Sequence, residues 1–320
     1  GIGWYIEEYG IAQLSFNITD TTQVSLHQLF ELACERAAIR GVRVTGSELV
    51  GVVPLQLMLE AGRYFLHKQK RSSGISDEEI LKIAIKSLGL DELAPFDPQK
   101  KIIEYLIEDK DEKKLIDLSV KQFAHLTASE SVAPGGGSVS ACMGALGVAL
   151  GTMVANLSSH KRGWEDQWES FSTWAEKGKA YHEELLQLVD EDTRAYNGII
   201  AAFGLPKNTE EEKAVRSQAI QNATKRAMEV PFRVAETSCN SMEVMLAMVS
   251  KGNPNSISDA GVGALAARSA VMGASLNVQI NALDLKDKEF AKELTDKVKQ
   301  LELKAQQLET EILHIVKSNL

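Results

Sequence analysis

Aromatic residues, cysteines and clustered basic charge are all scarce in this sequence of 320 residues. Aromatic residues make up 6% of the chain, and 35 Lys and Arg stand against 44 Asp and Glu, which gives a net charge of −9. Because no dense basic block is present, the composition argues against a nucleic-acid-binding protein. The 44% hydrophobic and 25% charged content is typical of a globular protein with ample material for cores, and the length suffices for two domains.

Only three cysteines occur, Cys34, Cys142 and Cys239, and they lie far apart in the chain. Their odd number and wide spacing predict reduced thiols in a cytoplasmic protein. No secretory signal is recognised where the sequence starts at Gly1, in keeping with that expectation. No cluster of His, Cys and carboxylate residues has the spacing of metal ligands, so we expect no metal site.

Formal charge is absent from the whole stretch 131–159. The stretch is long enough to cross a bilayer. Its body, 139–157, is nevertheless built mainly of Ala, Gly, Ser, Met and Val, and it lacks the Leu, Ile and Phe density and the aromatic belt of a membrane span. Gly144, Gly147 and Gly151 follow at the spacing of helix contacts. We therefore expect a central helix packed closely by its neighbours, and no membrane span.

A proline and three glycines come directly before this predicted helix, in the order Pro134, Gly135, Gly136, Gly137, followed by Ser138. Glycine has no Cβ, so its main-chain N–H groups can approach a ligand closely. Where such a loop meets a helix N-terminus, the unpaired N–H groups and the helix dipole favour an anion or a polar ligand edge. The alternative interpretation is a tight loop leading into a buried helix. The local pattern leaves both open.

The N-terminal third alternates between strand and helix patterns. Period-two hydrophobicity predicts a strand over 11–18 and a second, short strand over 42–44. A helix is expected from the cap Ser25 to Gly41, another over 54–67, and a third from the capping box at Ser76 to Gly89. This is an α+β subdomain. Two strands are few for an independent sheet, so we expect a further part of the domain to supply more of it.

The remainder of the chain shows helix patterns alone. The last of these helices has a heptad-like stripe, which can pack on a bundle or on a second subunit. The pattern predicts an all-α helical bundle, so the protein is mainly α overall, with domains over 1–108 and 115–320 and a linker over 109–114. The expected helices cover 115–126, 139–157, 164–203, 209–251 with a kink or break at Pro231, 259–283 capped by Ser258 or Asp259, and 290–315.

Asp192 lies in the middle of the apolar stripe of the helix predicted over 164–203. A carboxylate on an inward face costs several kcal/mol unless it is paired, hydrogen-bonded or protonated. An ion pair with Arg268 or Lys161 would satisfy it, and so would a functional role. Asp190, two residues earlier, points roughly the opposite way on an ideal helix, which indicates a solvated surface acid.

Asn277 and Asn281 lie one turn apart on one helix face, in a run that carries no charge between Arg268 and Asp284. Buried amides need hydrogen bonds, which other helices or a ligand can provide. Asp259 suits a helix N-cap, and it is also a candidate substrate-binding residue. Lys161 follows the C-terminal end of the central helix, where it favours the dipole and can also attract an anionic ligand tail.

Seven short segments occur in an order that carries a family resemblance. They cover 1–5, 46–54, 102–106, 133–138, 189–192, 205–209 and 277–281. Together they resemble the bifunctional formimidoyltransferase-cyclodeaminase family of histidine and folate metabolism. The first three are similar to the C-terminal subdomain of the transferase, and the other four to the cyclodeaminase domain.

This resemblance implies an all-helical ammonia-lyase that converts 5-formimidoyltetrahydrofolate into 5,10-methenyltetrahydrofolate and ammonia. It implies a polyglutamylated tetrahydrofolate substrate, no metal, and homo-oligomers (dimers or higher) with sites near subunit interfaces. The family places the catalytic acid in the Val-Asp-x-Asp segment, where the stripe geometry favours Asp192 over Asp190. Asn277 and Asn281 would then bind the pterin, and the loop Gly135–Ser138 would admit the substrate or bind its tail.

The transferase activity depends, in this family, on a catalytic histidine and folate contacts in an N-terminal subdomain that no part of this sequence resembles. We therefore expect no formimidoyltransferase activity from this chain alone. Two other functions stay open from the sequence. One is a methenyltetrahydrofolate cyclohydrolase, which would use water against the same bridge, and the other is a non-catalytic helical scaffold.

Overall fold

The computed structural model describes residues 1–109 and 112–320. These residues divide into two compact units: Gly1–Gln69 with Ser76–Asp109, and Lys70–Ile75 with the chain that follows Asp109. The linker expected over 109–114 falls partly on residues 110 and 111, which lie outside the described residues.

The first unit carries a two-stranded antiparallel sheet. Strand β1 (Ile2–Ile6) pairs with β2 (Ile11–Ser15), so that Ile6 faces Ile11 across a turn that ends at Gly10 with a positive φ of 64°. The strand predicted over 42–44 was wrong, and β1 was not predicted. Residues 42–44 have no partner strand among the described residues, so they gain no inter-strand hydrogen bonds. A short turn instead brings β1 beside β2, and these two strands pair.

Helices make up most of the rest of this unit. Ser25 caps α1 (Leu26–Ile39) through a reciprocal capping box with Gln28, as the sequence predicts for the helix start. Ser76 accepts a hydrogen bond from the backbone N–H of Glu79 at the start of α3 (Asp77–Ser87), which is one half of the predicted capping box; the return bond from the Glu79 side chain is not formed. The other helices are α2 (Leu55–Lys68), α4 (Pro98–Lys101) and α5 (Ile103–Ile107). Met58, Leu66, Ile80 and Ile102 form its buried core, whereas α1 has no buried residue.

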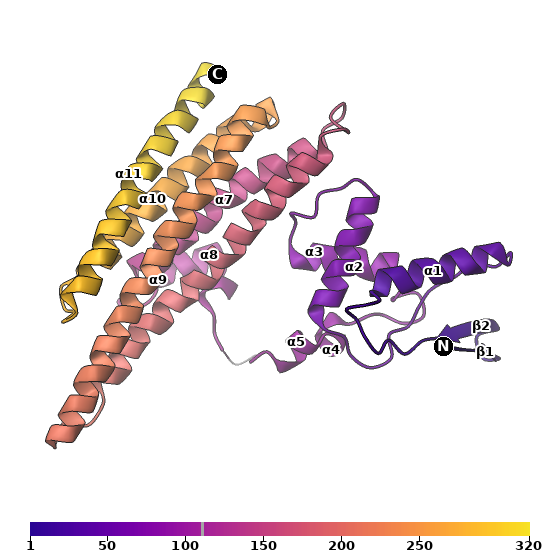
Figure 1. Ribbon diagram of the computed structural model, residues 1–320, viewed down its shortest axis with the longest axis horizontal. Helices are drawn as coiled ribbons and strands as arrows, with labels where there is room; N and C mark the ends of the chain where they lie inside the picture. Colours follow the sequence, from indigo (N-terminus) through magenta and orange to yellow (C-terminus); the bar gives the residue numbers. More distant parts are fainter. Residues whose placement is uncertain (110–111) are drawn as a thin grey trace. The chain divides into compact units, whose positions relative to one another are not determined.

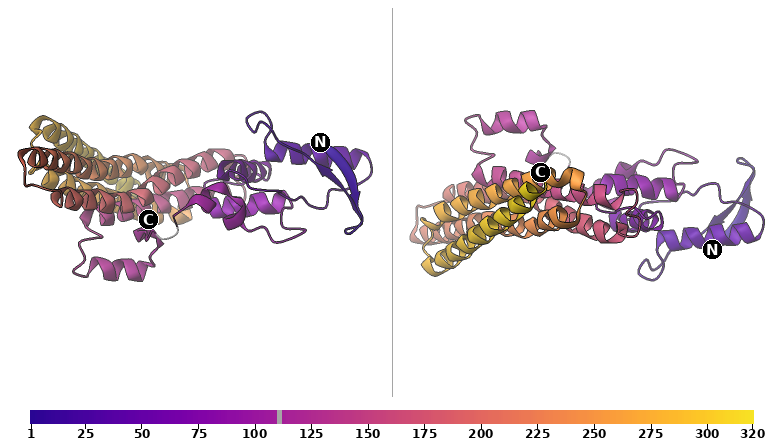
Figure 2. Two further views of the ribbon diagram at one scale, coloured as in Figure 1. Left: turned by 90° about the horizontal axis from the view of Figure 1, so that it is seen from below. Right: turned by 90° about the horizontal axis from the view of Figure 1, so that it is seen from above.

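The second unit is a bundle of long helices (Figure 1). In the bundle, α7 packs against α8 and α10, α9 packs against the same two helices, and α11 lies on α9 and α10. Figure 2 shows that the short helix α6 stands off the long ones in both views. The elements are η1 (Leu115–Asp117), α6 (Val120–Thr127), α7 (Gly136–Ser159), α8 (Trp168–Phe203), α9 (Glu210–Lys251), η2 (Pro254–Ser256), α10 (Ile257–Ala282) and α11 (Lys288–Ser318).

Several predicted boundaries in this unit need correction. The helix expected over 115–126 is interrupted, because Ser119 starts α6 with a capping box of its own. Asp259 does not cap α10; it lies in the first turn, and Ser256 occupies the N-cap position. The break considered at Pro231 does not occur, since α9 continues through the proline. The capping box of Thr209 with Glu212 is confirmed at the start of α9.

The charge-free helix α7 packs against α8, α9 and α10 in the bundle. It is the one helix of the described residues with the length and composition to cross a membrane, and most of it is buried inside the protein. Gly147 and Gly263 allow α7 and α10 to approach very closely: a Cβ on either glycine would lie under 3 Å from the carbonyl oxygen of the other. The close packing predicted for this helix is thus confirmed, whereas its exposed outer face shows that it is not central.

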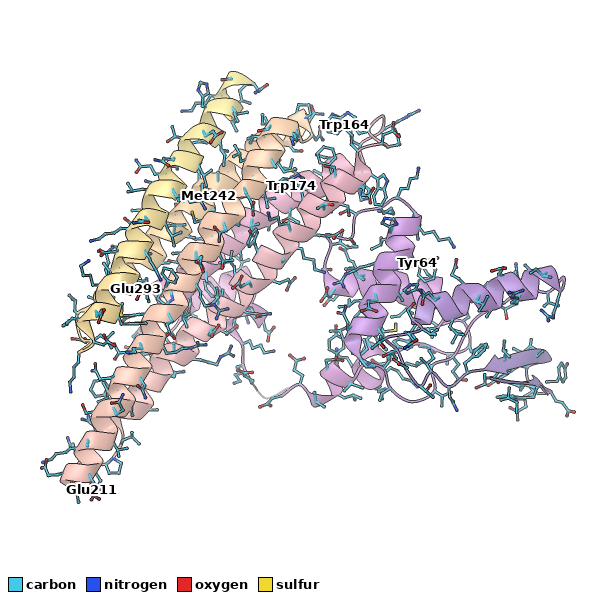
Figure 3. The ribbon with its side chains drawn as sticks, in the orientation of Figure 1. Tyr64, Trp164, Trp174, Glu211, Met242 and Glu293 are labelled. Carbon is cyan, nitrogen blue, oxygen red and sulfur yellow. The ribbon has the colours of Figure 1, made fainter. Side chains whose placement is uncertain are left out.

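The apolar stripe of α11 faces its own bundle. Leu294, Val298 and Ile312 are buried in the same core as Met242 of α9, which Figure 3 labels. The sequence left two possible partners for this stripe, the bundle and a second subunit, and in the structure the stripe packs on the bundle.

Candidate functional site

The first turn of α7 meets the middle of α8 at the carboxylate of Asp192. The backbone N–H of Ser138 donates to Asp192 Oδ2 at 2.9 Å, and the Ser138 hydroxyl lies 3.2 Å from the same oxygen. A Cβ on Gly137 would lie only 2.1 Å from Asp192 Oδ1. The carboxylate thus rests on the backbone of α7, in a space that only glycine leaves open.

This contact changes the interpretation of the glycine loop. The N-cap residue of α7, Gly135, has no side chain to satisfy the first N–H groups, and Asp192 supplies an acceptor from another helix instead. Part of the anion site at the α7 N-terminus is therefore occupied by the protein's own carboxylate. Gly136 remains exposed, so its backbone is open to a ligand.

Asp192 has no cationic partner of the kind considered from the sequence. Arg268 pairs with Glu309, with 2.7 Å between Nε and Oε2, and the Lys161 ammonium lies 3.9 Å above the centre of the Trp164 ring. Burial raises the pKa of Asp192 above its ordinary value, while the two hydrogen bonds from Ser138 act in the opposite direction. The site therefore holds a half-buried carboxyl with increased affinity for a proton.

Asn277 of α10 lies on the other side of the same helix end. A Cβ on Gly136 would lie 3.1 Å from Asn277 Nδ2. That nitrogen donates to the carbonyl of Gly273 at 2.8 Å, one turn back on its own helix. Nothing among the described residues bonds Asn277 Oδ1. Gly136, Asp192 and Asn277 are thus brought together from three helices.

Asn281 makes a different contact from its neighbour one turn earlier. Its Nδ2 donates at 2.8 Å to the carbonyl oxygen of Ala227 in α9. Ala227 lies four residues before Pro231, and a proline has no N–H to give that carbonyl its usual helical bond. Asn281 therefore satisfies the carbonyl that Pro231 leaves free, and of the two uses considered for this amide the structure shows the helix–helix bond.

Asp190 is not the solvated surface acid that its helix phase indicated. The residue is only 8% exposed, and its Oδ1 accepts a hydrogen bond of 2.6 Å from the backbone N–H of Leu115. The prediction was wrong because η1 covers this face of α8, and no local pattern could show that. Leu115 donates to Asp190, and Ser138 donates to Asp192. The segment 115–138 is therefore bound to α8 at both of its ends.

Ser138 was predicted to bind the substrate, but its side chain is too deeply buried to contact a ligand. It is 0% exposed, and besides Asp192 its hydroxyl approaches Val189 and Thr193 of α8. Thr193 was not among the predicted site residues. Its only sequence signal is its place directly after the Val-Asp-x-Asp segment.

Two predicted binding residues lie at the other end of the bundle. Lys161 follows α7, a helix of 24 residues and about 36 Å, at the end opposite Gly136. Asp259 is in the first turn of α10, which runs antiparallel to α7, so it also lies away from Asn277. In Figure 3, Trp164, over whose ring the Lys161 ammonium lies, marks this end of the bundle, and Glu211 marks the opposite tip, at the α8–α9 hairpin. Within one chain, neither residue shares a site with Asp192.

Possible metal ligands do not gather at this site. In the described ranges 1–109 and 112–320, no group of three or more His, Cys, Asp or Glu is placed to hold a metal ion. The three cysteines are all unbonded to one another.

Comparison with known proteins gives matches to both parts of the chain. The family model for formiminotransferase-cyclodeaminase matches residues 119–300, and the model for the formiminotransferase domain matches residues 1–108. The chain is 37% identical to the formimidoyltransferase-cyclodeaminase of Rattus norvegicus over 302 residues, which is 94% of this chain and 56% of that protein. The chain thus spans little more than half the length of such relatives.

Two shorter proteins match the helical part. A methenyltetrahydrofolate cyclohydrolase of Methylorubrum extorquens is 36% identical over 200 residues, which is 62% of this chain and 96% of that protein. The crystal structure of formiminotetrahydrofolate cyclodeaminase from Thermotoga maritima superposes with a TM-score of 0.56 at 26% identity, and it covers 63% of this chain and 96% of that one. The chain belongs to the formimidoyltransferase-cyclodeaminase family.

Proposed function

We propose that the helical unit is a cytoplasmic formimidoyltetrahydrofolate cyclodeaminase, an ammonia-lyase that forms 5,10-methenyltetrahydrofolate. The observation that carries this proposal is the carboxyl of Asp192, half-buried and held by Ser138 beside the exposed backbone of Gly136. Ring closure needs one group that first removes and then returns a proton, and a carboxyl of raised pKa is suited to both tasks. The family membership supplies the substrate class.

The reaction is balanced with this single carboxyl. The ionised Asp192 pairs with the cationic amidine of the substrate, and N10 attacks the amidine carbon to form a tetrahedral intermediate. Asp192 takes the N10 proton and gives it to the amino nitrogen, which leaves as ammonia while the N5–C–N10 bridge becomes the methenyl cation. Because the ring closure is intramolecular, orientation supplies much of the rate.

The other polar groups of this helix end would orient the folate. Gly135 and Gly136 offer backbone N–H groups at the α7 N-terminus, and Asn277 Oδ1 can accept from the amino edge of the pterin. Asn281 would act on the same pterin through its Oδ1, since its Nδ2 is engaged with Ala227. The chemistry assigns no step to a metal.

A homo-oligomer is supported by the outer face of α7 and α10. On α7 this face exposes large apolar side chains, and on α10 it continues them without a charged residue. An apolar patch of this kind marks an interaction surface, and one without charge can pack on an identical copy. The residues are Leu146, Met153, Leu157, Val262, Leu265, Leu276 and Ile280.

In such an assembly, a second copy could bring its Lys161 and Asp259 to this chain's site, where the lysine would suit the glutamate tail of a polyglutamylated folate. Sedimentation equilibrium tests the assembly. A monomer at micromolar concentration contradicts it and removes both residues from the site.

For the N-terminal unit we propose the C-terminal subdomain of a formimidoyltransferase, with domains over 1–108 and 115–320 joined by 109–114. Its sheet exposes Trp4, Tyr5 and Leu14, and α1 buries no residue. These apolar surfaces fit the expectation that a further α/β subdomain covers them and completes the transferase. We expect the purified chain to show no glutamate-dependent transfer, and turnover with glutamate would refute this.

The central test is turnover of 5-formimidoyltetrahydrofolate by the purified chain, followed by methenyl-folate absorbance and ammonia release. We expect both products from the wild type, and a loss of about 10²- to 10⁴-fold in kcat in Asp192→Asn, the range typical of general acid–base groups. Asp166→Asn, an exposed acid outside the site, serves as control. Equal turnover in Asp192→Asn contradicts the catalytic assignment. Hydrolysis of methenyl-folate without ammonia release from the formimidoyl substrate would instead identify a cyclohydrolase.

A further inference from the structure

The hydroxyl of Ser138 has three acceptors and one proton. Its Oγ lies 2.8 Å from the carbonyl oxygen of Val189, 3.2 Å from Asp192 Oδ2 and 3.3 Å from Thr193 Oγ1. All three acceptors belong to α8, and Ser138 itself is fully buried. Water is therefore not available to replace whichever of these bonds the hydroxyl does not make.

Three other buried hydroxyls of the same helix behave differently. Ser140, Thr152 and Ser158 each donate to the carbonyl four residues earlier in α7, at 2.7 to 2.8 Å. Such bonds within a helix are the usual way to satisfy a buried hydroxyl. Ser138 lies in the first turn, and its hydroxyl is directed across the helix contact to the segment that carries Asp192.

Charged groups near this contact are few and already paired. No residue of α7 carries a charge, and α10 carries none between Arg268 and Asp284. On α8, Arg194 pairs with Glu112, and Glu191 pairs with Arg226 and Arg233 of α9. Asp190 is turned to Leu115. Within 1–109 and 112–320, the hydrogen bonds of Ser138 are therefore the nearest polar influence on the Asp192 carboxyl.

We propose that Ser138 is a positioning residue whose hydroxyl turns with the charge of Asp192 and so sets the proton affinity of the catalytic carboxyl. When Asp192 is ionised, the hydroxyl donates to Oδ2, because a hydrogen bond to a charged acceptor is the stronger one. When Asp192 has taken up a proton, the hydroxyl donates to the Val189 carbonyl. This inference rests on the proposed function for its catalytic meaning, but the coupling between the two side chains can be measured without substrate.

The test is a ¹³C NMR titration of the Asp192 carboxyl in the full chain, with Asp192→Asn to assign the resonance. Ser138→Ala keeps the backbone bond and removes only the hydroxyl. We expect it to raise the pKa of Asp192 by about half a unit to one unit, the difference between a hydrogen bond to the charged carboxylate and the weaker bond to the Val189 carbonyl that replaces it on protonation. Ser140→Ala, which removes a neighbouring hydroxyl that bonds Gly136, should leave the titration unchanged.

Turnover gives a second readout. If Asp192 must be ionised in the free enzyme, the acid limb of kcat/KM moves to higher pH by the same amount in Ser138→Ala, and Ser138→Cys, with a weaker donor, lies between. Equal titration of wild type and Ser138→Ala overturns the proposal, as does a uniform loss of rate with an unmoved limb. If the wild type releases no ammonia, the proposed function fails, while the titration still decides the role of Ser138.

Discussion

The contact between Gly137 and Asp192 allows a sharp test by one methyl group. In Gly137→Ala, the new Cβ would lie 2.1 Å from Oδ1, 2.4 Å from Cγ and 2.5 Å from Oδ2 of Asp192. All three distances are far below van der Waals contact. The aspartate side chain is short, so the carboxylate has to leave its place on α7 and lose the bond from Ser138 N.

The change in stability follows from two opposing effects. A lost hydrogen bond to a charged group costs about 1.5–3 kcal/mol. Replacing glycine by alanine inside a helix contributes about 0.5–1 kcal/mol of stability in return. We expect a net loss of about 1–2 kcal/mol in the free energy of unfolding. Turnover should fall by about 100-fold, because a displacement of about 1 Å at the reacting group has that effect.

Gly198→Ala is the matched control for this experiment. Gly198 lies on the same helix as Asp192, six residues later, and a Cβ there meets nothing within 4 Å. It should gain about 0.5–1 kcal/mol in stability and keep full activity. Urea unfolding and steady-state ammonia release measure both variants. Full turnover in Gly137→Ala would show that the position of Asp192 on α7 does not matter to the chemistry.

Three further predictions concern the acids and the paired amide. Burial raises the pKa of Asp192 above its ordinary 3.8, so the folded state binds this proton more tightly than the unfolded state does. The proton therefore contributes to folding stability fully below pH 3.8, and the contribution is lost as the pH rises from 3.8 through the pKa of the folded state. The stability of Asp192→Asn relative to wild type should therefore increase over that window and stay constant above it; urea midpoints that differ by the same amount at every pH contradict this. Asp190→Ala should free Leu115 and increase proteolysis within 112–118, while Asp190→Asn, which can still accept the bond, should resist; equal cleavage of both argues against this role. Asn281→Ala should lower the free energy of unfolding by about 1–2 kcal/mol in the wild-type background, but clearly less in the Pro231→Ala background, where residue 231 regains its N–H. A double-mutant cycle that shows no coupling between the two substitutions would refute the link.

Those parts of the fold that depend on neighbouring residues were predictable from the sequence. The cap at Ser25 and the capping box at Thr209 join residues three apart, so their signal is complete in a short window. The stripe of α11 and the charge-free α7 are equally local. Strand pairing depends on more than the pattern within one strand. The run that forms β1 was recognisable as a strand only through its pairing with β2, and residues 42–44 have no partner strand among the described residues.

For the site, the helix phase placed Asp192 correctly on a buried face, and the glycines before α7 marked a close approach. Neither pattern could show that the two features meet each other, since Asp192 and Ser138 are 54 residues apart. The same limit hid the burial of Asp190, whose partner lies 75 residues away. Polar residues on inward faces identify which side chains need partners, but the partners come from the packing of helices.

Asn281 and Pro231 show how two unsatisfied hydrogen-bonding groups can satisfy each other. A proline inside a helix leaves the carbonyl four residues earlier without its donor, and a buried asparagine needs an acceptor. Taken alone, Pro231 suggested a kink or break in its helix, and Asn281 suggested either a helix–helix bond or a ligand contact. In the structure, the amide of Asn281 reaches the carbonyl of Ala227, so α9 continues through Pro231 and α10 is fixed to it. This bond lies one turn from Asn277, and it therefore holds in place the part of α10 that faces Gly136.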